Sequence, residues 1–236
     1  MRARTWVTIA GGLLLLGVTT LWRISKATRW QICGDLVWQV PTSERVVALT
    51  FDDGPVPGHV DEVLEALSAR NARATFFLTG QGIEGDRNDA IKILAAGHEI
   101  GNHSYSHQRM ILRSGEFIRE EIESTDRAIR ELGVQGEILF RPPYGKKLLG
   151  LPLYLARHHR RTVMWSVEAE KDPSHGKDAA SIARYVTANV QPGAILLFHV
   201  LTKSREAERQ ALPVVLDRLA EAGYRFASVS DLIALK

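Results

Sequence analysis

The sequence has one cysteine, no internal repeat and no low-complexity tract. The single cysteine, Cys33, excludes an intrachain disulfide and suits an exported protein that avoids free thiols, although it could pair between two chains. Without repeats or biased tracts, the region after residue 44 suits one domain. At about 190 residues, that region is large enough to bury roughly 70% of the surface of its unfolded chain.

Strong net charge is also absent from most of the chain. The formal net charge is +3, but residues 1–40 hold five Lys or Arg and one Asp, so the remainder carries 25 basic and 26 acidic residues. This near-neutral remainder gives no basis for a nucleic-acid partner. The basic residues near the N-terminus suit anionic lipid headgroups instead.

Two adjacent carboxylates, Asp52 and Asp53, follow the apolar run 46–51 and precede a Gly-Pro turn. A strand that ends in this way presents one carboxylate on each side of the chain, so one can bind a metal while the other transfers a proton. A solvated surface turn is the alternative for such a pair on its own. His103 and His107, four residues apart, favour the metal site, because two imidazoles and Asp53 form a three-ligand set that leaves positions open for water and substrate.

Three further segments extend the pattern. Arg141–Gly145 reads Arg-Pro-Pro-Tyr-Gly, Trp165–Asp172 follows a short apolar run, and another apolar run ends at His199. Together with Thr50–Pro55 and His103–His107, these segments resemble, in this order, the five motifs of the polysaccharide deacetylase family with the NodB homology domain, carbohydrate esterase family 4. The resemblance extends from about residue 44 to the C-terminus.

The resemblance implies a role for each matching residue. Asp52 would be the general base, Asp53, His103 and His107 the metal ligands, Arg141 the group that orients the base, Tyr144 the backbone N–H donor to the oxyanion, and His199 the general acid. Asp172 would pair with His199 or Arg141, Leu197 would line the pocket for the acetyl methyl group, and Trp165 would contact the substrate.

The chain departs from the family pattern at two positions. Pro173 stands where the family often has Trp, which puts one wall of the sugar groove in doubt. Val200 stands where the family often has Asp, which could alter the surroundings of the acid. Neither departure touches the metal ligands.

The chemistry fits these residue types. A bound divalent ion lowers the pKa of water towards about 7 and polarises a carbonyl, which amide hydrolysis requires. Asp52 would accept the water's proton, the Tyr144 N–H would stabilise the oxyanion, and His199 would protonate the leaving amine. We expect removal of N-acetyl groups, with release of acetate, from an N-acetylglucosamine-containing polysaccharide such as peptidoglycan or a chitin-like oligosaccharide. Zn²⁺ is the favoured ion, with Co²⁺ or Mn²⁺ as alternatives.

Two alternative functions stay open at this point. The same machinery would serve a deformylase or deacylase of a lipid-linked amino sugar, because groove residues cannot be assigned from one sequence. The second alternative is a catalytically silent carbohydrate-binding domain, although a binding protein has no reason to keep proton-transfer groups.

Apolar runs alternate with segments of helical period along the chain. The predicted strands are Val46–Phe51, Ala74–Thr79, His98–Gly101, Ile138–Arg141, Thr162–Ser166, Ala194–His199 and Arg225–Ser228. Repeated βα units predict a parallel sheet covered by helices, and the motif residues fall at or just beyond strand C-terminal ends. We expect an α/β fold, a distorted (β/α)7 barrel of the NodB type, with an exposed loop over residues 80–88.

The first 40 residues contain an apolar run from about Trp6 to Trp22, with basic residues on both sides. Such a run predicts a hydrophobic helix that serves as a membrane anchor or a secretory signal. No clear cleavage site is present and Trp at each end suits a membrane interface, so an uncleaved anchor is favoured over secretion. We expect residues 1–40 to form this segment and a linker, and residues 41–236 to form an extracytoplasmic catalytic domain, because sugar polymers lie outside the cell.

Overall fold

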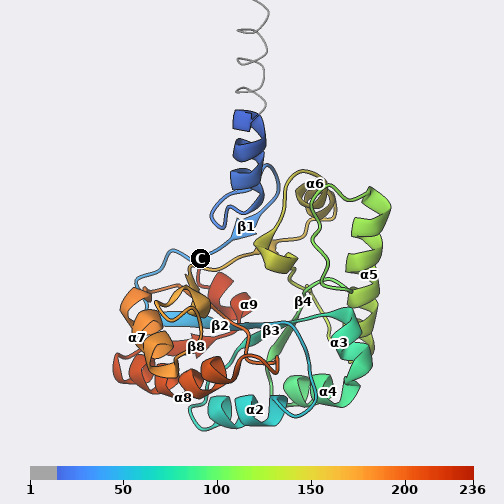
Figure 1. The fold of residues 1–236 in the computed structure, drawn as a ribbon. Coiled ribbons are helices and arrows are strands. Elements are labelled where there is room, and N and C mark those ends of the chain that lie inside the picture. The colour runs from blue at the N-terminus through green and yellow to red at the C-terminus, as the bar shows by residue number, and fades with distance from the viewer. Residues whose placement is uncertain (1–14) are drawn as a thin grey trace, which may run out of the picture.

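The computed structural model describes residues 15–236, and its main body is an α/β domain built on a parallel sheet (Figure 1). The strands of this sheet run in the order β4-β3-β2-β7-β6, and β8 also pairs with β2. They are β2 (Val46–Asp52), β3 (Thr75–Leu78), β4 (Glu99–Asn102), β6 (Val167–Glu168), β7 (Ile195–Phe198) and β8 (Arg225–Ala227). A separate parallel pair joins β1 (Leu36–Val37) to β5 (Thr162–Val163).

Strand β2 is the centre of the sheet. All seven of its residues are buried, and it pairs with β3, β7 and β8. A strand covered on both faces needs a nearly continuous apolar sequence, and Val-Val-Ala-Leu-Thr-Phe provides one. Asp52 therefore stands at the C-terminal end of a strand that is enclosed along its whole length.

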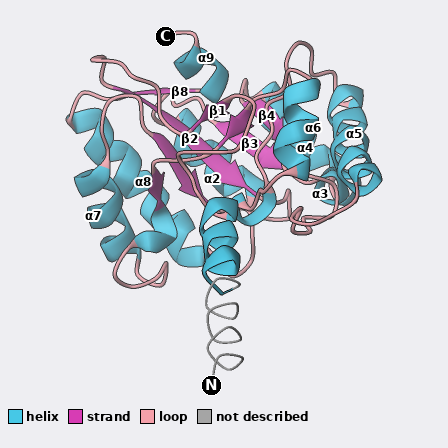
Figure 2. Ribbon diagram, turned by 90° about the horizontal axis from the view of Figure 1, so that it is seen from above, coloured by secondary structure: helices cyan, strands magenta, loops and turns pink. Residues whose placement is uncertain are grey.

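Helices surround the sheet (Figure 2). They are α2 (Val60–Ser68), α3 (Gly80–Gly85), α4 (Arg87–Ala95), α5 (Gly115–Glu131), α6 (Gly150–Arg157), α7 (Ala179–Asn189), α8 (Glu206–Glu221) and α9 (Val229–Ile233), with 3-10 turns η1 (Pro143–Gly145) and η2 (Ala169–Lys171). Side-chain caps fix several helix starts. The Ser114 side chain accepts the Phe117 N–H at α5, and Asp178 accepts two amide N–H groups at α7. These caps satisfy amide groups that have no partner within the helix.

The apolar core lies on both faces of the sheet. On one face, the Phe51 ring centroid lies 4.8 Å from that of Phe76 and 6.4 Å from that of Phe198, in a cluster that includes residues of α2, α7 and α8. On the other face, Phe77 belongs to a cluster with Val229 and Leu232 of α9. Packing on both faces holds the strands in place and so fixes the positions of their C-terminal ends.

The α/β class and the parallel sheet are confirmed, but no closure of the predicted distorted barrel is detected in the part of the chain that the structure describes. Within the described chain, the pairing of named strands in this sheet ends at β4 and β6. The predicted strand at 138–141 makes only isolated bridges, through Phe140, to the segments on either side. Pro142 and Pro143 follow at once and have no N–H to donate, so no ladder extends from this segment.

The other predicted strands agree well with the structure. Elements β2, β3, β4, β7 and β8 match their predicted bounds to within one residue at each end. The predicted strand Thr162–Ser166 is shorter and contains β5, while β1 and β6 were not predicted.

Residues 80–88 were predicted to form an exposed loop, and this prediction is wrong because they form α3 and the start of α4. The Thr79 side chain accepts the N–H of Gly82 and so caps α3. Glycine lowers helix propensity, but here it permits close packing. A Cβ added at Gly82 would lie 2.1 Å from the carbonyl oxygen of Gly54, in the turn that follows the two carboxylates.

Residues 15–25 form a helix that stands away from the domain (Figure 1). In the part of the chain that the structure describes, no helix is long and apolar enough to cross a membrane. Most of the predicted apolar span, including Trp6, falls on residues 1–14, outside the described residues. The membrane anchor therefore stays a prediction. The predicted domain boundary at residue 40 follows shortly after strand β1.

Candidate active site

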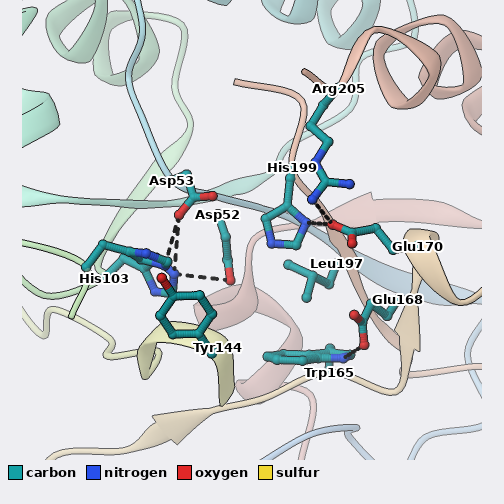
Figure 3. Close-up of a pocket in the computed structure, with 11 residues that line it drawn as sticks. Asp52, Asp53, His103, Tyr144, Trp165, Glu168, Glu170, Leu197, His199 and Arg205 are labelled. Carbon is teal, nitrogen blue, oxygen red and sulfur yellow. Dashed lines mark hydrogen bonds and ion pairs between the residues drawn. The ribbon is translucent and has the colours of Figure 1, made fainter. Parts of the chain in front are cut away.

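Side chains from the ends of several strands, and from the turns that follow them, surround a pocket of about 280 Å³ (Figure 3). The pocket is lined by Asp52, Asp53, His103, His107, Tyr144, Trp165, Glu168, Glu170, Leu197, His199 and Arg205. Parallel strands bring their C-terminal ends to the same edge, which is why motifs far apart in sequence meet here. Of the predicted site residues, all but Arg141 and Asp172 line the pocket.

Asp53, His103 and His107 form a group that can bind a divalent ion. Nε2 of His107 lies 3.1 Å from Oδ1 of Asp53, and Nε2 of His103 lies 3.8 Å from the same oxygen. One ligand atom of each residue lies within 4.8 Å of the other two. Two imidazoles and one carboxylate leave coordination positions open, as in catalytic zinc sites.

The surroundings of the two imidazoles suit metal binding. Nδ1 of His103 lies 2.8 Å from the carbonyl oxygen of Arg141. A proton on Nδ1 that donates to this carbonyl leaves Nε2 free as a ligand atom. Burial and the charge of His103 lower the pKa of His107, which favours the neutral form that ligates metals. The donor set therefore fits Zn²⁺ or a similar ion.

Asp52 is buried beside a buried Arg141. Nη1 of Arg141 lies 2.7 Å from Oδ1 of Asp52 and 2.7 Å from Oγ1 of Thr50, and the guanidinium also donates to the carbonyl oxygens of Val163 and Met164. Burial alone would raise the pKa of Asp52. The charge of Arg141, with those of two histidines, outweighs burial and holds this pKa below its usual value. Asp52 is therefore ionised and able to accept a proton.

His199 lies across the pocket from Asp52 and Asp53, with Glu170 behind it (Figure 3). Nδ1 of His199 lies 3.0 Å from Oε1 of Glu170, and the same oxygen lies 2.8 Å from Nη2 of Arg205. Burial lowers the pKa of His199, but the contact with Glu170 and the charges of nearby carboxylates outweigh it and raise the pKa to about 9. His199 therefore carries a proton at neutral pH.

Glu208 supplies a second carboxylate next to His199. Its side chain is fully buried, and its Oε2 accepts the backbone N–H of His199 at 2.7 Å. Val200, which replaces the Asp common in the family, is fully buried in the apolar core. Although position 200 has no carboxylate, the surroundings of His199 still include two acidic side chains from other elements.

The predicted pairing of Asp172 with His199 or Arg141 is not found. The Asp172 carboxylate accepts from Ser174 and from the Gly176 N–H at 2.6 Å, and it does not line the pocket. The 3-10 turn η2 separates Glu168 from Asp172, so the segment turns Glu170 towards His199 and directs Asp172 into the following loop. Pro173 does not line the pocket either.

Tyr144, Leu197 and Trp165 also line the pocket, and Leu197 is buried (Figure 3). The Tyr144 ring centroid lies 4.6 Å from that of His107, and Trp165 Nε1 donates to Glu168 at 3.0 Å. Such aromatic side chains offer flat apolar faces with polar edges, a combination that suits contact with a sugar ring.

Several residues in and next to this pocket have a strained backbone. Asp53, Ser104, His107 and Tyr144 have positive φ angles of 74°, 66°, 56° and 57°. A left-handed conformation costs a non-glycine residue about 1–2 kcal/mol, and it persists only where the surrounding structure fixes it. Strain of this kind clusters at functional sites, so the backbone independently supports a functional role for the pocket.

Sequence analysis missed several residues that the structure brings to the site. Glu170 lies in the same acidic segment as Asp172, so the motif indicated a carboxylate but not which one. Arg205 and Glu208 lie beyond the last motif and have no spacing signal that could have identified them. Thr50 lies inside an apolar strand sequence, and because Thr is common in strands nothing in the sequence marks it as a site residue.

Comparison with known proteins agrees with this site. Residues 39–162 match the family model described as polysaccharide deacetylase. Over 203 residues the chain is 33% identical to a peptidoglycan-N-acetylglucosamine deacetylase of Bacillus cereus, and the match covers 86% of this chain and 95% of the relative.

Two solved structures are similar to the fold. The peptidoglycan N-acetylglucosamine deacetylase Bc1960, crystallised with a hydroxamate-type ligand, has a TM-score of 0.80 and 30% identity, and the match covers 85% of this chain and 94% of that one. BA3943 of Bacillus anthracis, described as a pseudoenzyme of carbohydrate esterase family 4, has a TM-score of 0.75 and 26% identity, and the match covers 86% and 70% of the two chains.

The chain belongs to the polysaccharide deacetylase family, carbohydrate esterase family 4. The predicted family and the predicted enzyme class, a hydrolase that acts on carbon–nitrogen bonds, are confirmed.

Proposed function

We propose that this chain is a metal-dependent N-deacetylase that releases acetate from N-acetylglucosamine units of a polysaccharide, with peptidoglycan as the main candidate. One observation carries the proposal. An ionised carboxylate, Asp52, and a protonated imidazole, His199, line the same pocket from different strand ends, next to the three candidate metal ligands. Hydrolysis of an amide needs a base for the water and an acid for the amine, and this pocket offers both.

The chain's own side chains account for the proton transfers. Asp52, held in place by Arg141, accepts a proton from water as the water oxygen bonds to the acetyl carbon. The backbone N–H of Tyr144 is a candidate donor to the oxyanion. His199 donates its proton to the sugar nitrogen as the carbon–nitrogen bond breaks. Acetate and a free amine are the products, and water supplies the atoms that complete both.

Asp53, His103 and His107 would hold the ion. When bound, a divalent ion in this position polarises the acetyl carbonyl and lowers the pKa of water. Zn²⁺ is the proposed metal because imidazole and carboxylate ligands suit it, and Co²⁺ or Mn²⁺ are the alternatives.

Peptidoglycan is proposed because the curated relative and the solved structure with the stronger match both carry names of peptidoglycan-N-acetylglucosamine deacetylases. The pocket, at about 280 Å³, suits an acetamido group with part of a sugar ring rather than a long acyl chain. Leu197 would contact the acetyl methyl group and Trp165 the ring. The substrate would place the catalytic domain outside the cytoplasm, with the N-terminal segment attached to the membrane.

Acetate release from purified peptidoglycan and from N-acetylglucosamine oligomers tests the proposal. The full chain is assayed with added Zn²⁺, with chelator, and as the Asp52→Asn variant. The matched control is Asp61→Asn, which removes an exposed carboxylate on α2. Chelator-sensitive release that Asp52→Asn abolishes and Asp61→Asn preserves would support the proposal.

The same assay separates the alternatives. Release of formate from a lipid-linked formylated amino sugar, without acetate release, would support the deformylase. Glycan binding by a folded, zinc-loaded chain that releases neither acid would support the silent binding domain. The glycan-binding measurement is necessary because the chain is similar to a pseudoenzyme.

A further inference from the structure

A surface of exposed apolar and basic side chains lies between the base of helix 15–25 and the pocket. Its members come from three separate segments of the chain. We call it the helix-side rim, and it consists of Trp22, Lys26, Arg109, Leu112, Tyr144, Lys146 and Leu149. Leu112, three residues after Arg109, is 90% exposed.

Contacts among these side chains join the helix to the pocket. The Lys146 amine lies 3.8 Å from the centroid of the Trp22 ring, and the Lys26 amine lies 5.9 Å from it. The Arg109 guanidinium lies 5.1 Å from the centroid of Tyr144, which itself lines the pocket. Because Lys146 is two residues after Tyr144, these contacts connect the end of the helix to the mouth of the pocket.

Positive charge accumulates on this surface. Burial and the like charges of Lys26 and Arg109 lower the pKa of the Lys146 amine. Cations placed close enough to oppose each other's protonation favour an anionic partner, because such a partner relieves their repulsion.

The helix is firmly attached to the turn that carries Tyr144. The Lys147 N–H donates to the carbonyl oxygen of Ser25 at 2.8 Å, and the Lys147 amine donates to the carbonyl oxygen of Ala27. Lys147 and Ser25 are both buried. These bonds hold the end of the helix in a fixed position relative to the pocket, so whatever binds the helix also determines the direction in which the pocket faces.

We propose that the helix-side rim docks on the surface of an anionic phospholipid bilayer and thereby holds the pocket beside that surface. Exposed Trp, Tyr and Leu side chains mixed with Lys and Arg are typical of a surface that sits at the boundary between headgroups and acyl chains. Basic residues near a membrane add attraction to anionic lipids. Exposed apolar residues of helix 15–25, among them Leu15, Leu16 and Val18, extend the apolar part of this surface. The proposal requires contact with the bilayer surface, not a helix that crosses it, and it does not depend on the enzymatic activity.

Fluorescence quenching by brominated lipids tests the orientation directly. The full chain carries Cys33→Ser and one new cysteine labelled with a polarity-sensitive fluorophore, at Leu112→Cys or, as a control, at Arg218→Cys on α8. Helix α8 lies at the end of the domain away from helix 15–25 (Figure 1). Vesicles contain phosphatidylcholine alone or phosphatidylcholine with phosphatidylglycerol.

With phosphatidylglycerol present, we expect the label at position 112 to be quenched several-fold more strongly than the label at position 218, and we expect this difference to shrink on phosphatidylcholine alone. Substituting Lys26, Arg109 and Lys146 together with Gln should remove this difference. The matched control replaces three exposed arginines elsewhere on the domain, Arg73, Arg184 and Arg218, with Gln in the chain labelled at position 112, and it should leave the quenching unchanged.

Three results would overturn the proposal. Equal quenching at both positions would mean that the domain has no preferred face towards the bilayer. A difference that the triple Lys26, Arg109 and Lys146 substitution leaves intact would mean that these basic side chains do not direct the docking. A concentration-dependent shift of the position-112 fluorescence without vesicles, together with dimerisation in sedimentation, would show that a second copy of the chain covers this surface instead.

Discussion

At the scale of single residues, the buried pair of Asp52 and Arg141 shows how the site is held. Both side chains are almost fully enclosed, so each charge has lost its hydration. Arg141 compensates with donors to Asp52, to Thr50 and to two backbone carbonyls, and it lies over the ring of Phe77 at 4.2 Å. Such pairs add little net stability, but breaking one leaves an uncompensated charge in the interior.

Replacement of Arg141 with Met should therefore destabilise the fold strongly. We expect a loss of about 3–5 kcal/mol in the free energy of unfolding, because Asp52 would be left buried and unpaired. Urea denaturation measures this change. The control is Arg161→Met, which breaks an exposed pair with Glu137 and should cost no more than about 1 kcal/mol. Equal losses in the two variants would contradict the importance of the buried pair.

Glu170 sets the protonation of His199, and the Glu170→Gln variant should show it. Because the contact with Glu170 helps to raise the pKa of His199 to about 9, its loss should bring that pKa down towards its ordinary value. NMR titration of the His199 ring in the chelator-treated protein measures the shift. Asp172→Asn changes a carboxylate two residues after Glu170 that faces the Gly176 N–H instead, and it should leave the His199 pKa close to about 9.

The raised pKa also has a consequence for stability. A group that binds its proton more tightly when folded stabilises the fold while that proton is bound in both states. His199 should therefore contribute fully below about pH 6.5, and this contribution should be lost as the pH rises through about 9. Unfolding of the metal-free protein should show this decline between neutral and alkaline pH, and Glu170→Gln should flatten it. If the pH dependence of stability were the same in Glu170→Gln, the decline would not come from the His199 proton.

At the scale of elements, helix α3 supports the turn that carries the two carboxylates. Gly82 faces the carbonyl oxygen of Gly54 so closely that no side chain fits, whereas Gly85 on the same helix has nothing within 4 Å of an added Cβ. The two glycines share a helix but differ in surroundings. They therefore offer a matched pair of substitutions.

Gly82→Ala should displace the turn at Gly54 and weaken metal binding at Asp53 by about tenfold or more, a change of about 1.4 kcal/mol. Gly85→Ala should leave metal affinity unchanged and stabilise the fold by up to about 1 kcal/mol, because Ala is the better helix former. Calorimetric titration with Zn²⁺ and thermal unfolding provide the two measurements. Similar metal affinity in both variants would show that α3 does not support the site.

Several elements were predictable from sequence, and the exceptions have physical causes. Long buried runs such as that of β2 give a clear signal, since hydrophobic patterning is strongest where burial is complete. The two-residue strands β1 and β6 are too short to carry a period. The segment 138–141 has the composition of a strand, but its pairing is limited to isolated bridges through Phe140, and two prolines follow it at once. The sequence predicts a loop at the glycine-rich α3, because the close packing of Gly82 against Gly54 depends on the tertiary structure.

The residues that line the pocket were more predictable than the side chains that hold them in place. The metal ligands, the base and the acid stand at fixed places in motifs next to strand ends, and the structure brings them around one pocket. Which acid supports His199 could not be predicted, because it depends on how η2 rotates successive side chains. The contribution of Glu208 depends on where α8 begins, which no local pattern indicates.

At the scale of the whole molecule, the metal ligands connect separate parts of the chain. Asp53 follows β2, while His103 and His107 follow β4. An ion bound by all three adds a constraint that the unfolded chain lacks, so metal binding and folding are linked. At a free concentration near 1,000 times its dissociation constant, a ligand specific to the folded state adds about 4 kcal/mol of stability.

Zn²⁺ should therefore raise the thermal midpoint of the full chain, and chelator should reverse the change. His107→Gln should abolish most of this response, since it removes one of three ligands. His59→Gln, which changes a histidine outside the pocket, should respond like the unmodified chain. Scanning calorimetry with and without Zn²⁺ provides the comparison, and an equal response in both variants would place the metal elsewhere.

The position of β2 between three partner strands determines the order in which the site should be lost on heating. Amide protons of β2 can exchange with solvent only when the sheet itself opens, because the strand is buried along its whole length. Glu170 lies on η2 and follows the two-residue strand β6, an edge element that can open at lower cost. Moderate heating should therefore uncouple the proton donor from its partner while the carboxylate on the central strand still keeps its place.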